Sequence, residues 1–488
     1  MISQDLERAA RSDYDLVIAG GGIYGASLLL EASRHGLRCG LFEAGDFGGL
    51  TSWNSLRILH GGLRYLQSLD FGRFRQSVEA RRWFARAFPD LVLPLPCLMP
   101  LYGRGLKRPA VMRAALLAND VLSHARNDGV AAALRIPRGR ILDARATLAA
   151  CPALPGGGLQ GAALWHDYVL RSSERVLMEM LRWAASLGAT AVNYAPVDDV
   201  ETEAQRVTGV RVRSASTGVS CSVAARTVIN CAGPQVGELA GARAGTVSSL
   251  FEPSLAFNLL LDAELPGDCA VAVSAPAAGA PVLFLVPRAA GLLAGTMHLP
   301  RPPGTDNAVP SEGEIAGFLA QIRAAVPALQ VHSKDVRRVF AGLLPARAAG
   351  SAELAHQPKL VDHARSGGPQ GLFSVSGVKF TTAPEVAARL LRMTGLVPAA
   401  PRMLEPGSPW PLSAATALLT DAARLWSTDA DPLRETLRGV RREEAVSSID
   451  DLILRRTNWG STALDPDAVR GRIREIVPVD GERLETGT

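Results

Sequence analysis

The chain has 488 residues, of which 47% are hydrophobic and 20% are charged, and its net charge is +5. This length and composition predict a globular protein with two or three structural units and a large core. The cations are scattered along the chain, which favours anionic small molecules or a weak membrane-surface contact and argues against a nucleic-acid partner.

The six cysteines occur singly and without a CxxC pair, at Cys39, Cys97, Cys151, Cys221, Cys231 and Cys269. They are typical of buried, reduced thiols, and no His/Cys/Asp cluster has the spacing of metal ligands, so no metal is expected. The N-terminus lacks the apolar core of a signal peptide, and no apolar run reaches the roughly 18 residues needed to span a bilayer. We therefore expect a cytoplasmic protein, at most peripheral on the inner face of a membrane.

The first 44 residues carry the clearest pattern. A short buried strand is predicted over 14–20, a glycine-led helix over 21–36 and a second strand over 37–44. Apolar runs of strand length on either side of a helical pattern indicate one βαβ unit.

Three glycines in the turn of this unit form the pattern G-x-G-x-x-G. Gly20 permits the tight turn, Gly22 lets a pyrophosphate approach the backbone, and Gly25 lets the helix lie close to the sheet. Glu43 follows Gly25 by 18 positions (43 − 25) and closes the next strand, where its carboxylate can accept both ribose hydroxyls of an adenosine. The pattern predicts a bound dinucleotide; the alternative is a coincidental glycine turn.

Later elements follow in chain order. An amphipathic helix is predicted over 70–88, and the apolar segment 91–102 is interrupted by prolines, so it predicts at best an edge strand. A helix over 171–188 precedes an antiparallel meander and a buried strand within 226–234. Further predicted elements are strands at 254–262, 281–288 and 291–297, a helix that starts at Ser311, a strand at 371–377, a helix after it, and helical patterns that include 442–457.

Two of these later turns favour FAD over NAD. The strand at 226–234 ends in the turn Ala232-Gly233-Pro234, and Gly377, Thr381 and Thr382 open a helix whose positive end can face a reduced, anionic flavin. Each feature alone is equally typical of an ordinary strand end or helix cap. Together, and in this order after the βαβ unit, they favour FAD.

Several segments now resemble successive landmarks of one family, the FAD-dependent glycerol-3-phosphate dehydrogenases of the D-amino-acid-oxidase-like flavoprotein group. These are "DLVIAGGGIYGAS", "TSWNSLRILHGGLRYL", "LWHDYVLRSSERV", "VINCAGP", "SVSGVKFTTAPEVA" and the tail "SSIDDLILRRTNWG". The resemblance covers nearly the whole chain. It implies an α/β (α+β) fold in which a Rossmann-like FAD-binding domain is interleaved with an antiparallel-sheet substrate domain, followed by a small C-terminal helical domain.

We expect the parts of these domains to alternate along the chain. The FAD-binding parts are expected at 1–80, 166–250 and 346–398, the substrate domain at 81–165 and 251–345, a linker at 399–412, and the helical domain at 413–488. The motifs and the resemblance imply FAD-binding residues at Gly20, Gly22, Ile23, Tyr24, Gly25, Glu43, Ala44, Thr51, Ser52, Ser55, Val197, Ala232, Gly233, Gly377, Lys379, Phe380 and Thr381.

The segment 55–68 is basic, half apolar and hinged by two glycines, and the resemblance places it at the substrate end of the flavin. His60, Arg64 and Tyr65 would then lie near the reactive face, where buried cations beside a flexible backbone suit an anion. The alternative is that Arg64 pairs with a core carboxylate and Tyr65 only packs. Lys379 is either a contact of the substrate or a water near the flavin, or a surface charge at a helix start.

The catalytic candidates are therefore His60 and Lys379 for the substrate proton, with Arg64 and Tyr65 beside them. His166 and His298 are weaker candidates, being equally typical of ordinary polar partners.

One family feature is missing. Where the family has the arginine that grips the substrate phosphate, this chain has Leu344, and Arg347 is the nearest substitute along the chain. Met297 likewise replaces an acidic residue of the family after the Gly295-Thr296 turn. Because an aliphatic side chain cannot replace a bidentate guanidinium–phosphate contact, we expect the substrate to differ from glycerol 3-phosphate or to be held differently.

The expected reaction is the oxidation of a secondary hydroxyl of a polyol, a polyol phosphate or a related substrate, by hydride transfer to flavin N5. The alternatives are an amine or amino-acid oxidase of the same group, or a flavin-bound partner protein without turnover. The resemblance implies quinone or oxygen as the electron acceptor. The segment 108–118 permits a peripheral membrane contact, although a helix that packs on the core explains it equally well.

Overall fold

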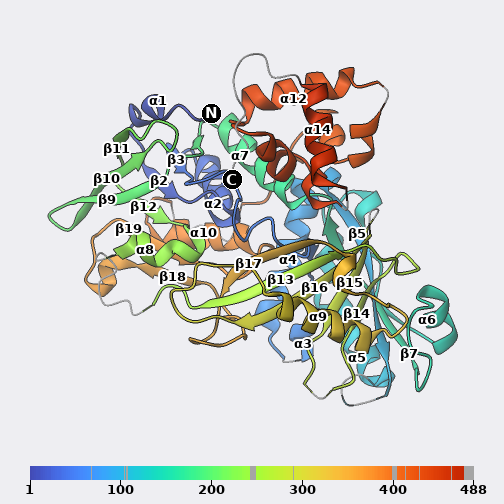
Figure 1. The fold of residues 1–488 in the computed structure, drawn as a ribbon. Coiled ribbons are helices and arrows are strands. Elements are labelled where there is room, and N and C mark those ends of the chain that lie inside the picture. Colours follow the sequence, from blue (N-terminus) through green and yellow to red (C-terminus); the bar gives the residue numbers. More distant parts are fainter. Residues whose placement is uncertain are drawn as a thin grey trace.

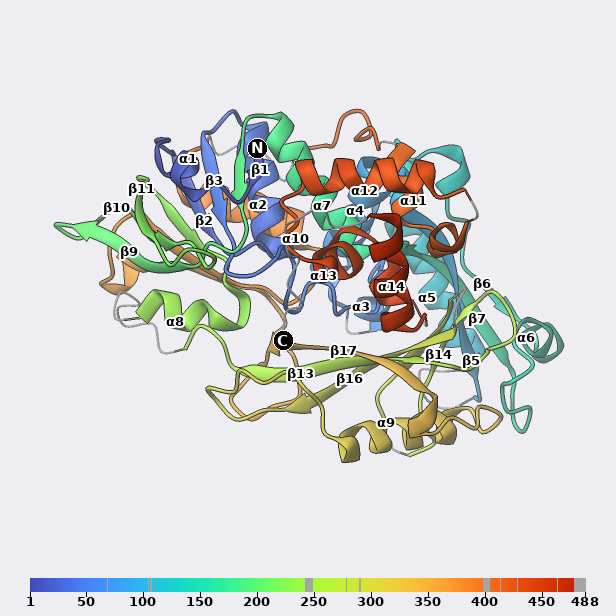
Figure 2. The same cartoon turned by 45° about the horizontal axis from the view of Figure 1, so that its top comes forward.

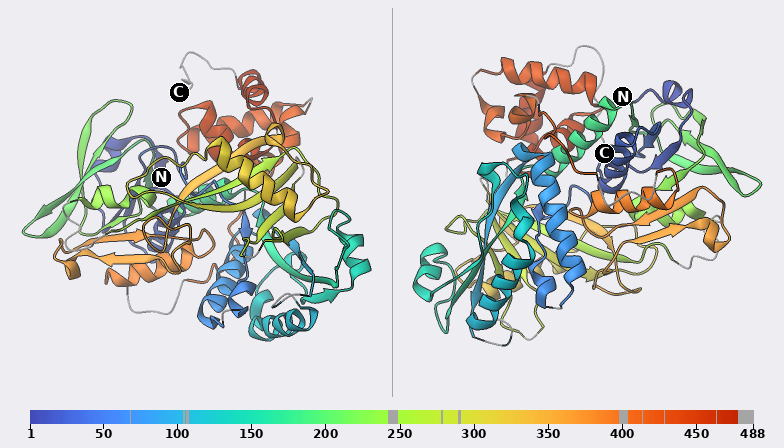
Figure 3. Two further views of the ribbon diagram at one scale, coloured as in Figure 1. Left: turned by 60° about the horizontal axis from the view of Figure 1, so that its bottom comes forward. Right: turned by 180° about the vertical axis from the view of Figure 1, so that it is seen from behind.

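The computed structural model describes residues 1–67, 69–103, 105, 108–241, 249–277, 279–288, 291–397, 404–412, 414–427, 429–462 and 464–477 (Figure 1). It contains a seven-stranded sheet, a nine-stranded sheet and a unit of C-terminal helices, and Figure 3 shows these three parts from behind. This mixed α/β architecture confirms the expected fold class.

The seven-stranded sheet has the order β1-β8-β3-β2-β12-β19-β18, and only the β18–β19 pair is antiparallel. Its four central strands are almost wholly buried, because both faces are covered. The helices α2, α7 and α10 cover one face, while α1 and the small sheet β11-β10-β9 cover the other. The strands are β1 (Ile2–Ser3), β2 (Leu16–Ala19), β3 (Cys39–Phe42), β8 (Thr190–Val192), β12 (Val228–Asn230), β18 (Lys359–Asp362) and β19 (Leu372–Ser376).

The covering elements match the predicted pattern closely. The predicted meander is the antiparallel sheet of β9 (Val197–Glu203), β10 (Arg206–Arg213) and β11 (Ser220–Ala224). The helices are α1 (Leu6–Ala10), α2 (Ile23–Arg34), α7 (Ser173–Ser186) and α10 (Ala383–Met393), and the short α8 (Val236–Ala240) follows β12.

The nine-stranded sheet has the order β17-β13-β16-β15-β14-β5-β7-β4, with β6 paired to β7. The helix α9 (Glu312–Ala325) covers its outer face (Figure 2), and it begins with the predicted Ser311 cap, which forms a capping box with Glu314. The strands are β4 (Ile58–Leu59), β5 (Val92–Leu101), β6 (Arg140–Leu142), β7 (Gly161–Leu170), β13 (Pro253–Leu261), β14 (Ala270–Val273), β15 (Leu283–Arg288), β16 (Gly291–Pro300) and β17 (Val336–Pro345). Beside it lie α3 (Leu63–Gln67), α4 (Phe71–Ala87), α5 (Pro109–Leu122) and α6 (Ala144–Ala150).

The prediction that 91–102 is at best an edge strand is wrong, because β5 lies between β7 and β14. The carbonyls of Leu91 and Leu101 accept hydrogen bonds from the β7 side, so the odd-numbered residues of β5 pair with β7. The three prolines occupy even positions, and their missing N–H groups all face the other side. The prolines therefore remove no hydrogen bond of the ladder with β7. On the side that the prolines face, β14 pairs only at Cys97 and Leu98.

The chain passes between the two sheets four times, as the expected order of parts requires, but two of the passages lie at other residues than expected. The expected boundary at 165–166 falls inside β7, and β4, within the first expected FAD-binding part, pairs with β7 in the nine-stranded sheet. Residues 404–412 of the expected linker carry no helix or strand, while 399–403, and 478–488 at the C-terminus, lie outside the described residues.

The C-terminal helices form a unit with its own apolar core and pack beside α7 (Figure 1). The helical pattern predicted over 442–457 is interrupted, because Ala445 has a φ of 53° and Ser448 caps a new helix. The elements are α11 (Ala414–Leu419), α12 (Asp431–Glu443), α13 (Ile449–Asp451), a π-helix (Leu452–Arg456) and α14 (Pro466–Ile476). A fully buried Arg175 on α7 binds both carboxylate oxygens of Glu444, at 2.7 and 2.8 Å, and fixes the unit to α7.

Candidate active site and cofactor site

A cavity of about 1400 Å³ lies between the two sheets. Its lining comes from the carboxyl ends of β2, β3, β12 and β19 and from residues of the nine-stranded sheet. Sites for one small ligand usually measure about 300–1,000 Å³, so this cavity has room for a cofactor together with a substrate.

The glycine turn at one end of the cavity requires glycine on steric grounds. Gly20 has a φ of +104°, and a Cβ there would lie 2.6 Å from the carbonyl oxygen of Cys231. A Cβ on Gly25 would lie 1.9 Å from the carbonyl oxygen of Gly20, so only glycine lets α2 approach the sheet this closely. Gly22 caps α2 and lines the cavity, which presents the positive end of the helix to an anion.

The predicted ribose acid stands beside this turn. Glu43 lines the cavity, and its carboxylate accepts hydrogen bonds from the backbone N–H of Gly21 at 2.5 Å and of Gly45 at 2.9 Å. Burial raises the pKa of Glu43, and the donated N–H groups oppose that rise. Ser52 completes this end, since its hydroxyl accepts from the N–H of Ile23, in the first turn of α2, at 2.9 Å.

Tyr24 links the start of α2 to the segment before α10. Its hydroxyl donates to the carbonyl of Lys379 at 2.9 Å and accepts from the N–H of the same residue at 3.0 Å. A Cβ on Gly377 would lie 2.0 Å from the Tyr24 ring, which explains the glycine there. Burial raises the pKa of Tyr24 to about 12, so this phenol stays protonated at neutral pH.

The structure brings the predicted cofactor residues together around one cavity. Only Gly25 does not line it, because it packs behind the turn. The hydroxyl of Thr51 donates to the carbonyl of Leu343 at 2.9 Å and so ties its loop to β17. The lining residues are Gly20, Gly22, Ile23, Tyr24, Glu43, Ala44, Thr51, Ser52, Ser55, Val197, Ala232, Gly233, Gly377, Lys379, Phe380 and Thr381. This glycine cradle, with a helix N-terminus and a ribose acid, fits FAD.

A cluster of cations surrounds Tyr65, which also lines the cavity. The ammonium of Lys379 donates to its hydroxyl and lies 4.4 Å from the ring centre. Arg64 donates to the same hydroxyl at 3.3 Å, and the Arg73 guanidinium lies 4.8 Å from the ring centre. Burial raises the pKa of Tyr65, but the charges of Lys379 and Arg64 outweigh it, and the pKa lies below its usual value.

The contacts of Arg64 and Lys379 differ from those of a cation paired with a core carboxylate and of a surface charge at a helix start. Within the described part of the chain, Arg64 forms no ion pair with a carboxylate. Lys379 is not a surface charge at a helix start, because its ammonium meets the Tyr65 hydroxyl inside the cavity; burial lowers its pKa.

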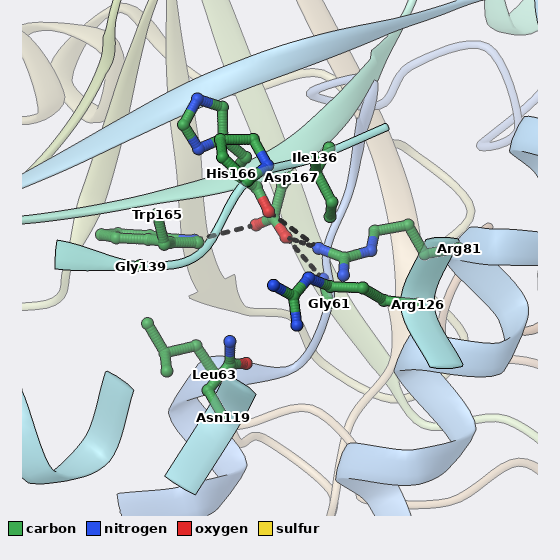
Figure 4. A pocket seen from close by; sticks show the side chains of 11 residues that line it. Gly61, Leu63, Arg81, Asn119, Arg126, Ile136, Gly139, Trp165, His166 and Asp167 are labelled. Carbon is green, nitrogen blue, oxygen red and sulfur yellow. Dashed lines mark hydrogen bonds and ion pairs between the residues drawn. The ribbon is translucent and has the colours of Figure 1, made fainter. Parts of the chain in front are cut away.

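His60 is held by an acid that the sequence analysis did not single out. The ladder between β4 and β7 pairs Leu59 with Tyr168 and so brings His60 beside Asp167, with Nδ1 3.2 Å from a carboxylate oxygen. Asp167 also accepts from the N–H of Gly61 and from Arg81, both at 2.7 Å, and from Trp165 at 3.3 Å (Figure 4). A sequence signal existed, since Asp167 lies in the quoted segment "LWHDYVLRSSERV".

This arrangement explains the glycine hinge. A Cβ on Gly61 would lie 2.3 Å from the Arg81 guanidinium, and Gly62 has a φ of +84°. Burial raises the pKa of Asp167, but the hydrogen bond from His60 and the charge of Arg81 outweigh it and bring the pKa to about 2. Asp167 therefore remains a carboxylate at any pH near neutral.

The other candidates are less well placed. His166 is among the residues that line the small pocket beside Asp167, but its ring points away from Asp167 (Figure 4), and burial lowers its pKa. His298 lines the large cavity, where burial and the charge of Arg64 lower its pKa to about 4, so it is uncharged at neutral pH. Leu344 lines the cavity on β17, whereas Arg347 does not and instead pairs with Glu353 at 3.2 Å on the surface.

The glycine cradle and the cavity define a flavoprotein oxidoreductase, and comparison with known proteins agrees. The sequence profile of the family described as FAD dependent oxidoreductase matches residues 15–393. The chain therefore belongs to this family, and FAD is its cofactor.

The similarity extends beyond the matched region. Glycerol-3-phosphate dehydrogenase 1 of Mycobacterium tuberculosis is 29% identical over 95% of this chain and 94% of its own length. The glycerol-3-phosphate dehydrogenase structure from Bacillus halodurans, complexed with FAD, has a TM-score of 0.70 at 19% identity, covering 97% of this chain and 92% of its own. A glycine oxidase from Geobacillus kaustophilus, with a TM-score of 0.56 at 20% identity, covers 81% of this chain and 98% of its own. The expected resemblance and enzyme class are thus confirmed.

We predict that Glu43→Gln weakens FAD binding roughly ten- to a hundredfold, because an uncharged amide replaces a carboxylate acceptor at the ribose position. The dissociation constant follows from the change in flavin fluorescence when apoprotein is titrated with FAD. Glu203→Gln, at the exposed end of β9 and away from the cavity, is the control and should bind FAD as the unaltered protein does. Equal affinities for both variants would contradict the role given to Glu43.

Proposed function

We propose that this flavoenzyme oxidises a secondary hydroxyl group of a polyol, a polyol phosphate or a related small molecule. The observation that carries the proposal is His60, which Asp167 orients and which lines the same cavity as Tyr65, Lys379 and Arg64. FAD, when bound, supplies the group that accepts a hydride from carbon. The chain must then bind the substrate, orient it and remove the hydroxyl proton.

His60 is the proposed proton acceptor. Its Nδ1 is engaged by the Asp167 carboxylate, which leaves the other ring nitrogen for the substrate hydroxyl. Arg81 and the Gly61 N–H hold this carboxylate in place, so the imidazole keeps its orientation as it gains the proton.

Tyr65, Arg64 and Lys379 are the proposed substrate-orienting groups. Two cations on one phenol produce a positive potential at this end of the cavity, and a substrate phosphate or carboxylate would be attracted to it. On β17, by contrast, the side chain that faces the cavity is Leu344. The part of the substrate that reaches β17 is therefore proposed to be uncharged.

The direct test is anaerobic mixing of the yellow protein with a panel of substrates while the flavin absorbance is followed. Bleaching by glycerol 3-phosphate, or by an uncharged polyol, is the expected result. Bleaching by amines or amino acids alone would establish the alternative of an amine oxidase, a reaction class that the glycine oxidase neighbour's name suggests. No bleaching across a broad panel would favour a flavin-bound partner protein without turnover.

The same assay tests His60. His60→Gln should slow flavin reduction by about 10²- to 10⁴-fold, which is the usual range for a lost general base, while FAD binding is retained. His124→Gln, an exposed histidine after α5, is the control. An unchanged rate in His60→Gln would assign the proton to another group.

Leu344→Arg should restore a guanidinium on β17, facing the cavity. If glycerol 3-phosphate reaches that strand, its KM should fall by about tenfold or more, because hydrogen bonds to charged groups are worth about 1.5–3 kcal/mol. The KM of an uncharged polyol should not improve. A fall for both substrates, or for neither, would mean that Leu344 does not face the substrate phosphate.

We also propose a peripheral contact with an anionic membrane surface and a lipid-borne quinone as electron acceptor, with oxygen as the alternative. None of the helices in the described residues is long and apolar enough to cross a membrane. However, α5 buries Met112 and Leu116 and turns apolar side chains outward. Its Leu117 is 62% exposed and its Val121 71% exposed.

Further exposed apolar side chains adjoin this face. Leu69, just before α4, and Phe71, the first residue of α4, are also exposed, and α3 lies beside α5 (Figure 1). Arg108 and Arg113 are exposed at the start of α5 and add positive charge. A basic, apolar helix face of this kind is typical of an interfacial contact.

The double substitution Leu117→Glu with Val121→Glu should abolish co-sedimentation with vesicles that contain anionic lipid, because it places two carboxylates in the proposed contact. Val309→Glu, at an exposed valine elsewhere, should leave the binding unchanged. Absence of vesicle binding by the unaltered protein would remove the membrane proposal and leave the oxidoreductase proposal intact.

A further inference from the structure

The C-terminal helical unit holds a loop of the cofactor site, although it does not reach the cavity itself. Within the described residues, the cavity lining ends in the chain at Thr382, well before this unit begins. The loop concerned is 44–57, which follows the ribose acid and carries Ser52 to the start of α2.

The first contact is a buried ion pair. Arg456 donates to both carboxylate oxygens of Asp46, at 2.7 and 2.8 Å, and its side chain is fully buried. The same guanidinium donates to the carbonyl of Glu444, and Asn193 donates to Asp46 at 2.8 Å. Asp46 is therefore fixed from two sides, three residues after Glu43.

The second contact reaches the middle of the loop. Arg455 donates to the carbonyl of Gly49 at 3.2 Å, and its guanidinium lies 4.5 Å from the ring centre of Trp53. Trp53 meets Phe340 of β17 edge to face at 5.6 Å, and the Arg57 guanidinium lies 5.0 Å from the Phe340 ring centre. The backbone between Asp46 and Trp53 is thus held on the side away from the cavity.

The unit that supplies these arginines is itself firmly anchored. Glu444 binds Arg175 and Arg182 of α7, and the hydroxyl of Tyr194 donates to Asp451 at 2.6 Å. The arginines end a π-helix, a rare element that often occurs at functional positions. A loop held in this way loses little further freedom when a ligand binds to its other side, and such preorganisation strengthens binding.

We propose that the C-terminal helical unit is a cofactor-retention element, in which Arg455 and Arg456 are positioning residues that hold the 44–57 loop in its FAD-binding conformation. The proposal depends on FAD as the cofactor and on no particular substrate. It predicts that the unit and the cofactor stabilise each other, because coupling between two sites is reciprocal.

Arg455 is a better residue to substitute than Arg456, because its side chain is only partly buried and its loss leaves the ion pair between Asp46 and Arg456 intact. Arg455→Met should weaken FAD binding roughly tenfold, since it removes the hydrogen bond to Gly49 and the charge over Trp53. Arg455→Lys keeps the charge and should lie closer to the unaltered protein. Arg424→Met removes an exposed ion pair with Asp421 in the same unit and should leave FAD binding unchanged.

Two measurements distinguish a positioning role of Arg455 in FAD binding from a general contribution to the stability of the fold. The first is the rise in Tm that saturating FAD produces, which should be smaller for Arg455→Met than for Arg424→Met. The second uses the unaltered protein: adding FAD to apoprotein should slow hydrogen exchange at the amides of 452–457. Equal loss of Tm with and without FAD, at an unchanged FAD dissociation constant, would overturn the proposal, as would unaltered exchange at 452–457.

Discussion

The site depends on the close approach of α2 to the seven-stranded sheet, which exists because Gly20 and Gly25 have no side chains. This contact sets the position of the N-terminus of α2, and with it the side chain of Tyr24. Tyr24 in turn holds the backbone of Lys379 through two hydrogen bonds, and the Lys379 ammonium meets Tyr65. The glycine turn and the cations around Tyr65 are therefore connected by one short chain of contacts. A shift of α2 would move both groups together.

Local chemistry explains why the cofactor half of the site is predictable from sequence. A glycine turn, a helix start and an acid at a strand end lie within 30 residues, and each has a steric or electrostatic reason at its own position. The partner of His60 could not be found in this way, because the contact with Asp167 spans 107 residues and arises only when β4 pairs with β7. The edge-strand prediction for 91–102 failed for a related reason. Proline content is visible in the sequence, but the side toward which its missing N–H groups face depends on the neighbouring strands.

The distribution of charge within the cavity separates two parts of substrate recognition. Arg64, Arg73 and Lys379 gather around Tyr65, while the facing position on β17 holds the aliphatic Leu344. Arg347 does not replace the absent charge, because it is exposed and paired with Glu353. The groups proposed to orient the reacting carbon are thus retained, and the departure from the dehydrogenase pattern that lines the cavity is Leu344. A change of this kind alters which molecule is accepted and preserves the chemistry, since specificity depends on contacts that distinguish substrates.

The buried ion pairs of the C-terminal unit fix the positions of their partners more than they add folding free energy. Removing Arg175, Glu444, Asp46 and Arg456 from water costs several kcal/mol per ion, and apolar side chains of similar volume would often stabilise a fold equally well. What apolar packing cannot supply is direction, because a bidentate pair fixes both the distance and the angle between its partners. Asp46 is three residues from Glu43, the proposed ribose acid, so a directional contact at Asp46 fixes the backbone that follows Glu43. The Asp46–Arg456 pair, where the helical unit meets the 44–57 loop, is therefore best understood as a constraint on the geometry of that loop rather than as a source of folding free energy, while Arg175 and Glu444 join the unit to α7.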